Sequence, residues 1–260
     1  MMRQPLAYIH PDANIADNVV IEPFVTIDKN VNIGEGTWIG SNVTIMEGAT
    51  IGKNCKIFPG AVISAVPQDL KFQGEESFVE IGNHTIVREF VTINRGTKSK
   101  RKTIIGNNVL LMAYVHIAHD CIIGDNSIIV NNVQIAGEVI VEEWAILGGA
   151  SAVHQFVHIG KHSIVSGGSL VRKDVPPYIK AGREPLAYEG INSIGLRRRN
   201  FSNEKINEIQ DLYRLIFNNG MNVTQAIQYI EANMKATPER DDILLFLKNS
   251  SRGIIKGYFE

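Results

Sequence analysis

The sequence predicts a mainly β protein, a parallel β-helix followed by an α-helical C-terminal domain. The first observation is an aliphatic side chain at every sixth residue from Ile9 to Val171. Of the 28 positions in this series 25 are aliphatic, whereas a chain that is 44% hydrophobic would give about 12 by chance. The second is a companion series of small or β-branched residues two positions earlier, such as Ala7, Val25 and Cys55. The third is helical spacing from about Ser202 onward.

A period of six contains the strand period of two three times. A chain that turns a corner at every hexapeptide makes a three-sided coil of three hexapeptides, which is typical of a parallel β-helix. Each aliphatic side chain then stacks on its equivalent in the next coil, about 4.8 Å away. Residues that tolerate positive φ follow the aliphatic position, as at Gly34, Asn54 and Asp125. Known hexapeptide-repeat proteins resemble this pattern, so we expect a left-handed prism, an exception to the usual crossover rule.

Two polar stretches interrupt the repeat, at about 64–78 and 94–103. They contain the three non-aliphatic positions of the series, Asp69, Glu75 and Ser99. The repeat resumes in the same phase after each stretch, so we expect two loops that project from corners of the coil. Loops on a rigid scaffold often carry function.

The chain divides into two predicted domains, a β-helix at 1–191 and a helical domain at 192–260. Residues 182–195 read as an irregular connection. Ser202 is suited to cap the first helix. Further helices are expected at about 223–234 and 238–248.

Composition excludes some classes of function. With 26 basic and 27 acidic side chains the formal net charge is −1, so there is no electrostatic case for nucleic-acid binding. The start lacks the apolar segment of a signal peptide and no stretch is apolar enough to span a membrane, so we expect a cytoplasmic protein without membrane insertion. Cys55 and Cys121 occupy the small-residue series and are expected to be buried filler.

One histidine stands where chemistry is expected. His119 lies two residues past an interior aliphatic and is followed by Asp120, which can fix its tautomer. A neutral imidazole held by a carboxylate is a common general base. The alternative is that His119 is an exposed corner residue without a role.

The three-hexapeptide coil places further residues beside His119. One full coil advances the numbering by 18, so His119, Gly137 and Gln155 should form a column along one corner. Such a column would line a slot for an extended substrate, with the Gly137 N–H placed to bind an oxyanion. A metal site of His116, His119 and His154 is disfavoured, because His116 and His119 flank Ile117 on a strand and do not project as one chelating pair.

Two basic clusters are either solvated surface or contacts for phosphates or an acidic partner. The first lies in the second loop and the second, Arg197 to Arg199, begins the helical domain near Asn192. The loop cluster consists of Lys98, Lys100, Arg101 and Lys102.

An ordered set of segments resembles the acyl-carrier-protein–UDP-N-acetylglucosamine O-acyltransferase family, over the whole length of the chain. The segments are 68–71 (QDLK), 79–82 (VEIG), 91–96 (VTINRG), 116–121 (HIAHDC), 152–156 (AVHQF), 174–178 (DVPPY), 190–192 (GIN) and 196–199 (LRRR). The resemblance implies a homotrimer with active sites between subunits. It implies transfer of an (R)-3-hydroxyacyl chain from acyl carrier protein to the glucosamine 3-hydroxyl of UDP-N-acetylglucosamine, the first step of lipid A biosynthesis, with no cofactor and no metal.

The resemblance also implies residue roles. His119 matches the general base, Asp120 its orienting partner and Gly137 the backbone donor to the oxyanion. Gly167 matches a position that limits acyl length, and a glycine there predicts a long acyl chain; alternatively it serves only the corner geometry. The residues that match substrate contacts are Asp69, Lys71, His116, His154, Gln155, Asn192, Arg198 and Arg199.

Two departures and two alternatives remain open. Glu138 stands where better-known members carry histidine, which puts a sugar-diphosphate contact in doubt, and the segment 182–190 is one residue longer than theirs. The chain could instead be another hexapeptide acyltransferase, such as the lipid A N-acyltransferase or an acetyl-CoA-dependent enzyme, or a non-enzymatic scaffold. The sequence leaves open whether the acceptor presents a 3-hydroxyl or a 3-amine.

Overall fold

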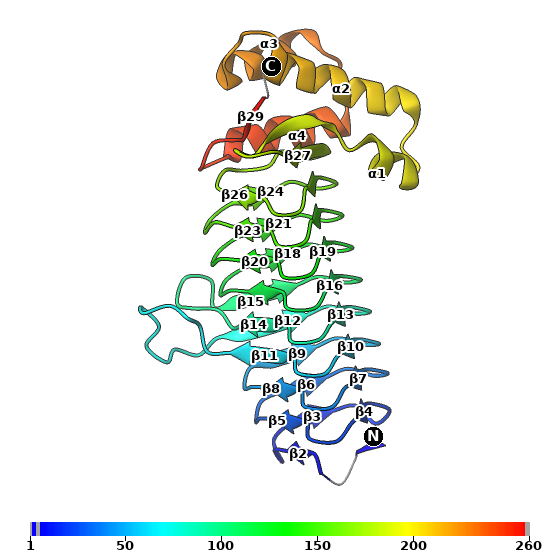
Figure 1. Cartoon of the computed structure of the whole chain (residues 1–260), viewed down its shortest axis with the longest axis vertical. Coiled ribbons are helices and arrows are strands. Elements are labelled where there is room, and N and C mark those ends of the chain that lie inside the picture. Colours follow the sequence, from blue (N-terminus) through cyan, green and yellow to red (C-terminus); the bar gives the residue numbers. More distant parts are fainter. Residues whose placement is uncertain (1, 4–5, 258–260) are drawn as a thin grey trace.

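The computed structural model describes residues 2–3 and 6–257, and over these the chain forms a three-walled prism capped by helices (Figure 1). We call the walls A, B and C, in the order in which each coil passes through them. Consecutive strands of the chain lie in walls A, B and C in turn. Neighbouring strands within a wall therefore come from consecutive coils, and they pair in parallel throughout the prism. The predicted parallel β-helix of hexapeptide repeats is therefore confirmed.

The walls hold 12, nine and eight of the described strands. Wall A consists of β1 (Met2–Arg3), β4 (Val20–Ile21), β7 (Trp38–Ile39), β10 (Lys56–Ile57), β13 (Ile86–Val87), β16 (Leu110–Leu111), β19 (Ile128–Ile129), β22 (Ile146–Leu147), β25 (Ile164–Val165), β27 (Ile179–Gly182), β28 (Ala187–Ile191) and β29 (Lys256–Gly257). Wall B consists of β2 (Tyr8–Ile9), β5 (Thr26–Ile27), β8 (Thr44–Ile45), β11 (Val62–Ala65), β14 (Thr92–Asn94), β17 (His116–Ile117), β20 (Gln134–Ile135), β23 (Ala152–Val153) and β26 (Leu170–Val171). Wall C consists of β3 (Asn14–Ile15), β6 (Asn32–Ile33), β9 (Ala49–Ile51), β12 (Phe78–Ile81), β15 (Lys102–Ile105), β18 (Ile122–Ile123), β21 (Ile140–Val141) and β24 (His158–Ile159).

The aliphatic series forms the core of the prism. Ile27 pairs with Ile45, and Ile45 with Ile63, so that one side chain of each coil rests on the next. All three are fully buried. Burial of one such side chain contributes about 1.5–3 kcal/mol, so every coil adds to the stability of the prism.

The two loops are insertions of whole hexapeptides. Partners in adjacent coils are usually three hexapeptides apart, but Val62 pairs with Thr92, five hexapeptides later, and Thr92 pairs with His116, four hexapeptides later. The first insertion therefore adds two hexapeptides and the second adds one, which is why the six-residue phase continues through them. The segments 66–77 (loop 1) and 95–101 (loop 2) both leave the prism at the edge where wall B leads into wall C (Figure 1).

The C-terminal helices follow the prediction closely. Ser202 caps α2 (Asn203–Asn218), and its side chain accepts a hydrogen bond from the Lys205 N–H at 3.2 Å. The remaining predicted helices are α3 (Val223–Asn233) and α4 (Pro238–Asn249). No helix in the described part of the chain combines the length and apolar character of a membrane span.

The prediction of an irregular connection at 182–195 is wrong. This segment contains β28, which runs antiparallel to β27, and the beginning of α1 (Ser193–Arg198). The hairpin is held by backbone pairing such as that of Ala181 with Tyr188, and backbone pairing leaves no hexapeptide signature. Tyr188 then stacks on Phe217 of α2, with 4.5 Å between ring centroids, and so joins the hairpin to the helices.

Candidate active site at an edge of the prism

His119, Gly137 and Gln155 lie in successive coils at the same edge, between walls B and C. The Glu138 N–H donates to the His119 carbonyl at 2.9 Å, and the Phe156 N–H donates to the Gly137 carbonyl at 3.2 Å. Gly137 lies directly against the imidazole, because a Cβ added there would be 2.5 Å from Cε1 and Nε2 of His119. The three-hexapeptide period therefore placed this column correctly.

His119 and Asp120 form a buried pair. The His119 Nδ1 lies 2.9 Å from the Asp120 Oδ2, and the two residues are 8% and 0% exposed. An ionised carboxylate can only accept hydrogen bonds, so Nδ1 carries the hydrogen atom and donates a hydrogen bond to Asp120. The other nitrogen, Nε2, is then left unprotonated and able to accept a proton, as a general base requires.

Loop 1 brings a second carboxylate to the open side of the imidazole. The Asp69 Oδ2 lies 3.9 Å from the His119 Nε2. The Asp69 Oδ1 accepts a hydrogen bond from the Lys71 N–H at 2.9 Å, which fixes the turn that carries both residues. The Lys71 side chain is exposed.

Two further predicted substrate contacts, His116 and His154, lie within three residues of a member of the column in the sequence. His116 lies on β17, and its Nδ1 is 2.7 Å from the Thr92 hydroxyl. Burial lowers the pKa of His116, so this imidazole is neutral near pH 7. His154 is exposed, and its Nδ1 donates to the Gln155 carbonyl at 3.0 Å.

The Asp120 carboxylate has partners that sequence reasoning missed. Its Oδ1 accepts from the N–H groups of Thr97 and Lys100, at 3.0 and 3.2 Å. Its Oδ2 accepts from the Thr97 hydroxyl at 2.6 Å. Thr97 lies in loop 2, outside the repeat, so no periodic signal could have marked it.

The predicted nucleotide contacts lie at a different edge, between walls C and A. The Arg199 guanidinium donates to the Trp144 carbonyl at 3.0 Å and lies 5.0 Å from the centre of the Trp144 ring. Asn192 caps α1 and donates to the His162 carbonyl at 2.9 Å. Arg198 is exposed. A single chain therefore does not bring these residues to His119.

Gly167 lies at the third edge, between walls A and B. The left-handed φ of this corner belongs to Gly168, at 72°, so a need for positive φ does not explain the glycine at 167. An added Cβ would lie 3.1 Å from the Gly149 carbonyl oxygen. Besides the predicted acyl-length role, the close approach of these two coils is therefore a reason for a glycine at position 167.

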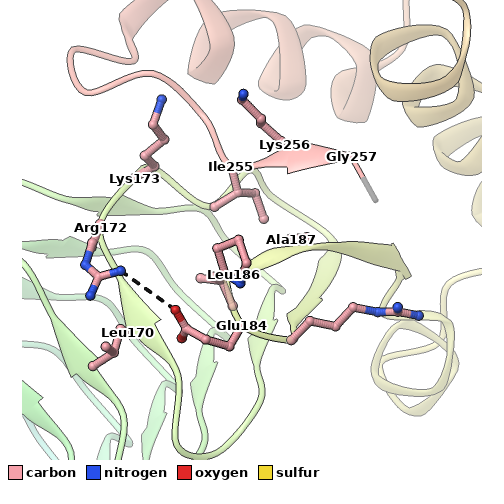
Figure 2. Close-up of a pocket in the computed structure, with 11 residues that line it drawn as sticks. Leu170, Arg172, Lys173, Glu184, Leu186, Ala187, Ile255, Lys256 and Gly257 are labelled. Atoms are coloured by element: carbon pink, nitrogen blue, oxygen red, sulfur yellow. Dashed lines mark ion pairs between the residues drawn. The ribbon is translucent and has the colours of Figure 1, made fainter. Parts of the chain in front are cut away.

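The edge that carries His119 leads to a pocket of about 770 Å³ below the helical cap (Figure 2). Arg172 and Lys173, which directly follow β26 of wall B, line it. The basic side chains that line the pocket are Arg172, Lys173, Arg183 and Lys256. The apolar side chains that line it include Leu170, Leu186 and Ile255. Arg172 pairs with Glu184 at 3.8 Å, as Figure 2 shows.

The metal alternative finds no assembled ligand set. Within the residues that the structure describes, no three His, Cys, Asp or Glu side chains are grouped so as to hold a metal ion.

Comparisons with known proteins agree with the geometry. A family profile described as UDP-N-acetylglucosamine O-acyltransferase, domain 2, matches residues 174–255, and the bacterial transferase hexapeptide profile matches residues 30–65 and 102–137. An acyl-[acyl-carrier-protein]–UDP-N-acetylglucosamine O-acyltransferase of Thiobacillus denitrificans is 40% identical over 97% of this chain and 98% of its own length. A relative of the same name from Chlorobaculum parvum is 48% identical over 74% of this chain and 73% of its own length.

Solved structures give the same result. The UDP-N-acetylglucosamine acyltransferase of Bacteroides fragilis is 53% identical and superposes with a TM-score of 0.96, covering 97% of this chain and 99% of its own. The enzyme from Francisella novicida is 40% identical with a TM-score of 0.96, covering 98% and 94%. The chain thus belongs to the acyl-[acyl-carrier-protein]–UDP-N-acetylglucosamine O-acyltransferase family.

Proposed function

We propose that the chain transfers an (R)-3-hydroxyacyl group from the phosphopantetheine thioester of acyl carrier protein to the 3-hydroxyl of UDP-N-acetylglucosamine, the first step of lipid A biosynthesis. The single observation that carries this proposal is the buried His119–Asp120 pair packed against Gly137. Family membership supports the O-acyltransferase over the N-acyltransferase, the acetyl-CoA-dependent enzyme and the non-enzymatic scaffold.

The chemistry follows from the column. The His119 Nε2 accepts the proton of the sugar 3-hydroxyl as its oxygen attacks the thioester carbonyl carbon. The new C–O bond forms while negative charge collects on the carbonyl oxygen. The Gly137 N–H, which has no hydrogen-bond acceptor among the described residues, is free to donate to that oxygen. The C–S bond then breaks, and His119 returns its proton to the departing pantetheine sulfur.

The proposed enzyme is a homotrimer. One chain carries its candidate residues on three different edges: His119 between walls B and C, Arg199 between walls C and A, and Gly167 between walls A and B. A substrate that contacts all three groups must lie between neighbouring prisms, where edges of different subunits meet. The nucleotide would then be held by Asn192, Arg198 and Arg199 of one subunit, and deprotonated at its sugar by His119 of the next.

The proposed donor approaches along the edge that carries His119. Lys173 follows β26, and β26 lies three coils beyond β17, the strand that precedes His119; at about 4.8 Å for each coil this is about 14 Å along the prism. The pantetheine arm has twelve bonds between its sulfur and its phosphate oxygen. An extended polypeptide has three backbone bonds per residue, so the arm is about as long as four extended residues, or about 14 Å. The basic rim of the pocket in Figure 2 is therefore placed to receive the phosphate of a donor whose thioester reaches His119.

Mass spectrometry tests the proposal directly. The purified protein is given carrier proteins loaded with hydroxyacyl chains of different length, and acceptor sugars with a 3-hydroxyl or a 3-amine. We expect acylated UDP-N-acetylglucosamine with the longer chains, and none with His119→Ala. A folded protein that acylates neither sugar with any donor refutes the proposed function; acylation of the amine alone replaces the proposed acceptor.

A further inference from the structure

Loop 2 surrounds the Asp120 carboxylate. The two N–H groups of Thr97 and Lys100 bind one oxygen, while the Thr97 hydroxyl and His119 bind the other. The Thr97 hydroxyl is itself oriented, because its oxygen accepts the Ser99 N–H at 3.2 Å and its proton is thus left for Asp120. Every oxygen of this buried carboxylate therefore has two partners, and three of the four contacts come from loop 2.

Corners of the same edge that loop 2 does not cover leave their side chains more exposed. Glu138 and Phe156 occupy the position of Asp120 one and two coils later, with the same left-handed φ of 60° and 67° against 61°. Glu138 is half-buried and Phe156 is exposed, whereas Asp120 is fully buried. The corner itself therefore turns this side chain toward solvent, and loop 2 is what encloses it.

We propose that Thr97 is a positioning residue of the acyltransferase, which acts through Asp120 to hold the His119 imidazole in the reactive tautomer and orientation. The inference rests on the proposed function. With the Thr97 hydroxyl removed, the Asp120 Oδ2 keeps only its contact to His119. The two N–H groups at Oδ1 still hold that oxygen, so the carboxylate can tilt about Oδ1. Among the described residues the imidazole makes its hydrogen bond to Asp120, so a tilt of that carboxylate changes the orientation of the ring.

The test compares Thr97→Val, which removes the hydroxyl at nearly constant volume, with Thr97→Ser, which retains it. Thr97→Val should lower kcat about 10- to 100-fold, the range found when the outer hydrogen-bond partner of a metal-binding histidine is lost. The KM for UDP-N-acetylglucosamine should change less than about twofold, because the Thr97 side chain is buried and its hydroxyl is bonded to Asp120. Thr97→Ser should restore most of kcat. The matched control is Ser99→Ala in the same loop, whose exposed side chain should leave kcat unchanged.

A double substitution separates a positioning role from a general structural one. In an Asp120→Asn background, Thr97→Val should change kcat by less than about twofold, since its route through Asp120 is already lost. If Thr97→Val does not fold, Thr97→Ala replaces it in the same comparisons. Two results with an active parent overturn the proposal. The first is a kcat that loss of the Thr97 hydroxyl leaves unchanged, and the second is a decrease in kcat that is as large in the Asp120→Asn background as in the parent. An inactive parent instead counts against the proposed function.

Discussion

Gly137→Ala should impair catalysis without unfolding the protein. The φ of Gly137 lies outside the left-handed region, so alanine fits its backbone. The new methyl group, however, would lie 2.5 Å from Cε1 and Nε2 of His119. The strain therefore falls on the imidazole and not on the fold.

The size of the effect follows from that distance. Carbon atoms in contact prefer about 3.5–4.0 Å, so the ring must retreat by at least about 1 Å. A displacement of about 1 Å in a reacting group typically costs about 100-fold in rate. The cost to folding is that of a small overpacking, about 1–3 kcal/mol, and the ring can relieve part of it by moving outward.

The assay measures kcat with acyl carrier protein and UDP-N-acetylglucosamine, alongside thermal melting. Gly149→Ala is the matched control, since Gly149 occupies the same hexapeptide position and its added Cβ would meet no atom closer than 3.2 Å. We expect a loss of about 100-fold for Gly137→Ala and little change for the control. Full activity of a folded Gly137→Ala protein would show that the imidazole does not need its observed position.

Other substitutions test the base, the acyl-length position and a half-buried histidine, His162, at the edge between walls C and A. His119→Ala should abolish turnover and leave melting unchanged; activity equal to that of the parent rejects the base. Gly167→Met should shift donor preference toward shorter acyl chains in competition assays, and an unchanged preference removes the acyl-length role. Burial, with Arg199 and Lys161 nearby, lowers the pKa of His162 from 6.5 to about 4. The stabilisation this gives is complete above pH 6.5 and is lost as pH falls toward 4. The melting temperature of the parent should therefore decline more over that range than that of His162→Gln. An equal decline in both proteins would show that the pKa of His162 is not lowered in the folded state.

The periodic part of the chain was predictable because one physical requirement recurs in every hexapeptide. Each must present an aliphatic side chain to the interior, as Ile27, Ile45 and Ile63 do, and each omission exposes a gap in the stack. The same period supplied the column of His119, Gly137 and Gln155, because residues one coil apart become neighbours in space. Helix α2 was likewise marked by its own period and by the cap at Ser202.

The hairpin and the short helix after the prism were not predictable by this means. The β27–β28 pairing depends on backbone hydrogen bonds and on the stacking of Tyr188 with Phe217, residues far apart in the sequence. Helix α1 spans only six residues and is held by its Asn192 cap, which also binds the His162 carbonyl. These contacts are tertiary, so no local pattern announces them.

The repeat and its interruptions contribute different things to the candidate site: the coils set the spacing along an edge, and the loops supply polar contacts. The coil fixes spacing along an edge, but its corners turn side chains outward, as Phe156 shows. Such a corner cannot by itself bury a carboxylate beside a histidine, because a buried carboxylate needs several donors. Loop 2 supplies those donors to Asp120, and loop 1 brings Asp69 to within 3.9 Å of the second ring nitrogen of His119, Nε2. The departures from the repeat are therefore where the chemistry is assembled, and the regular coils determine where those departures meet.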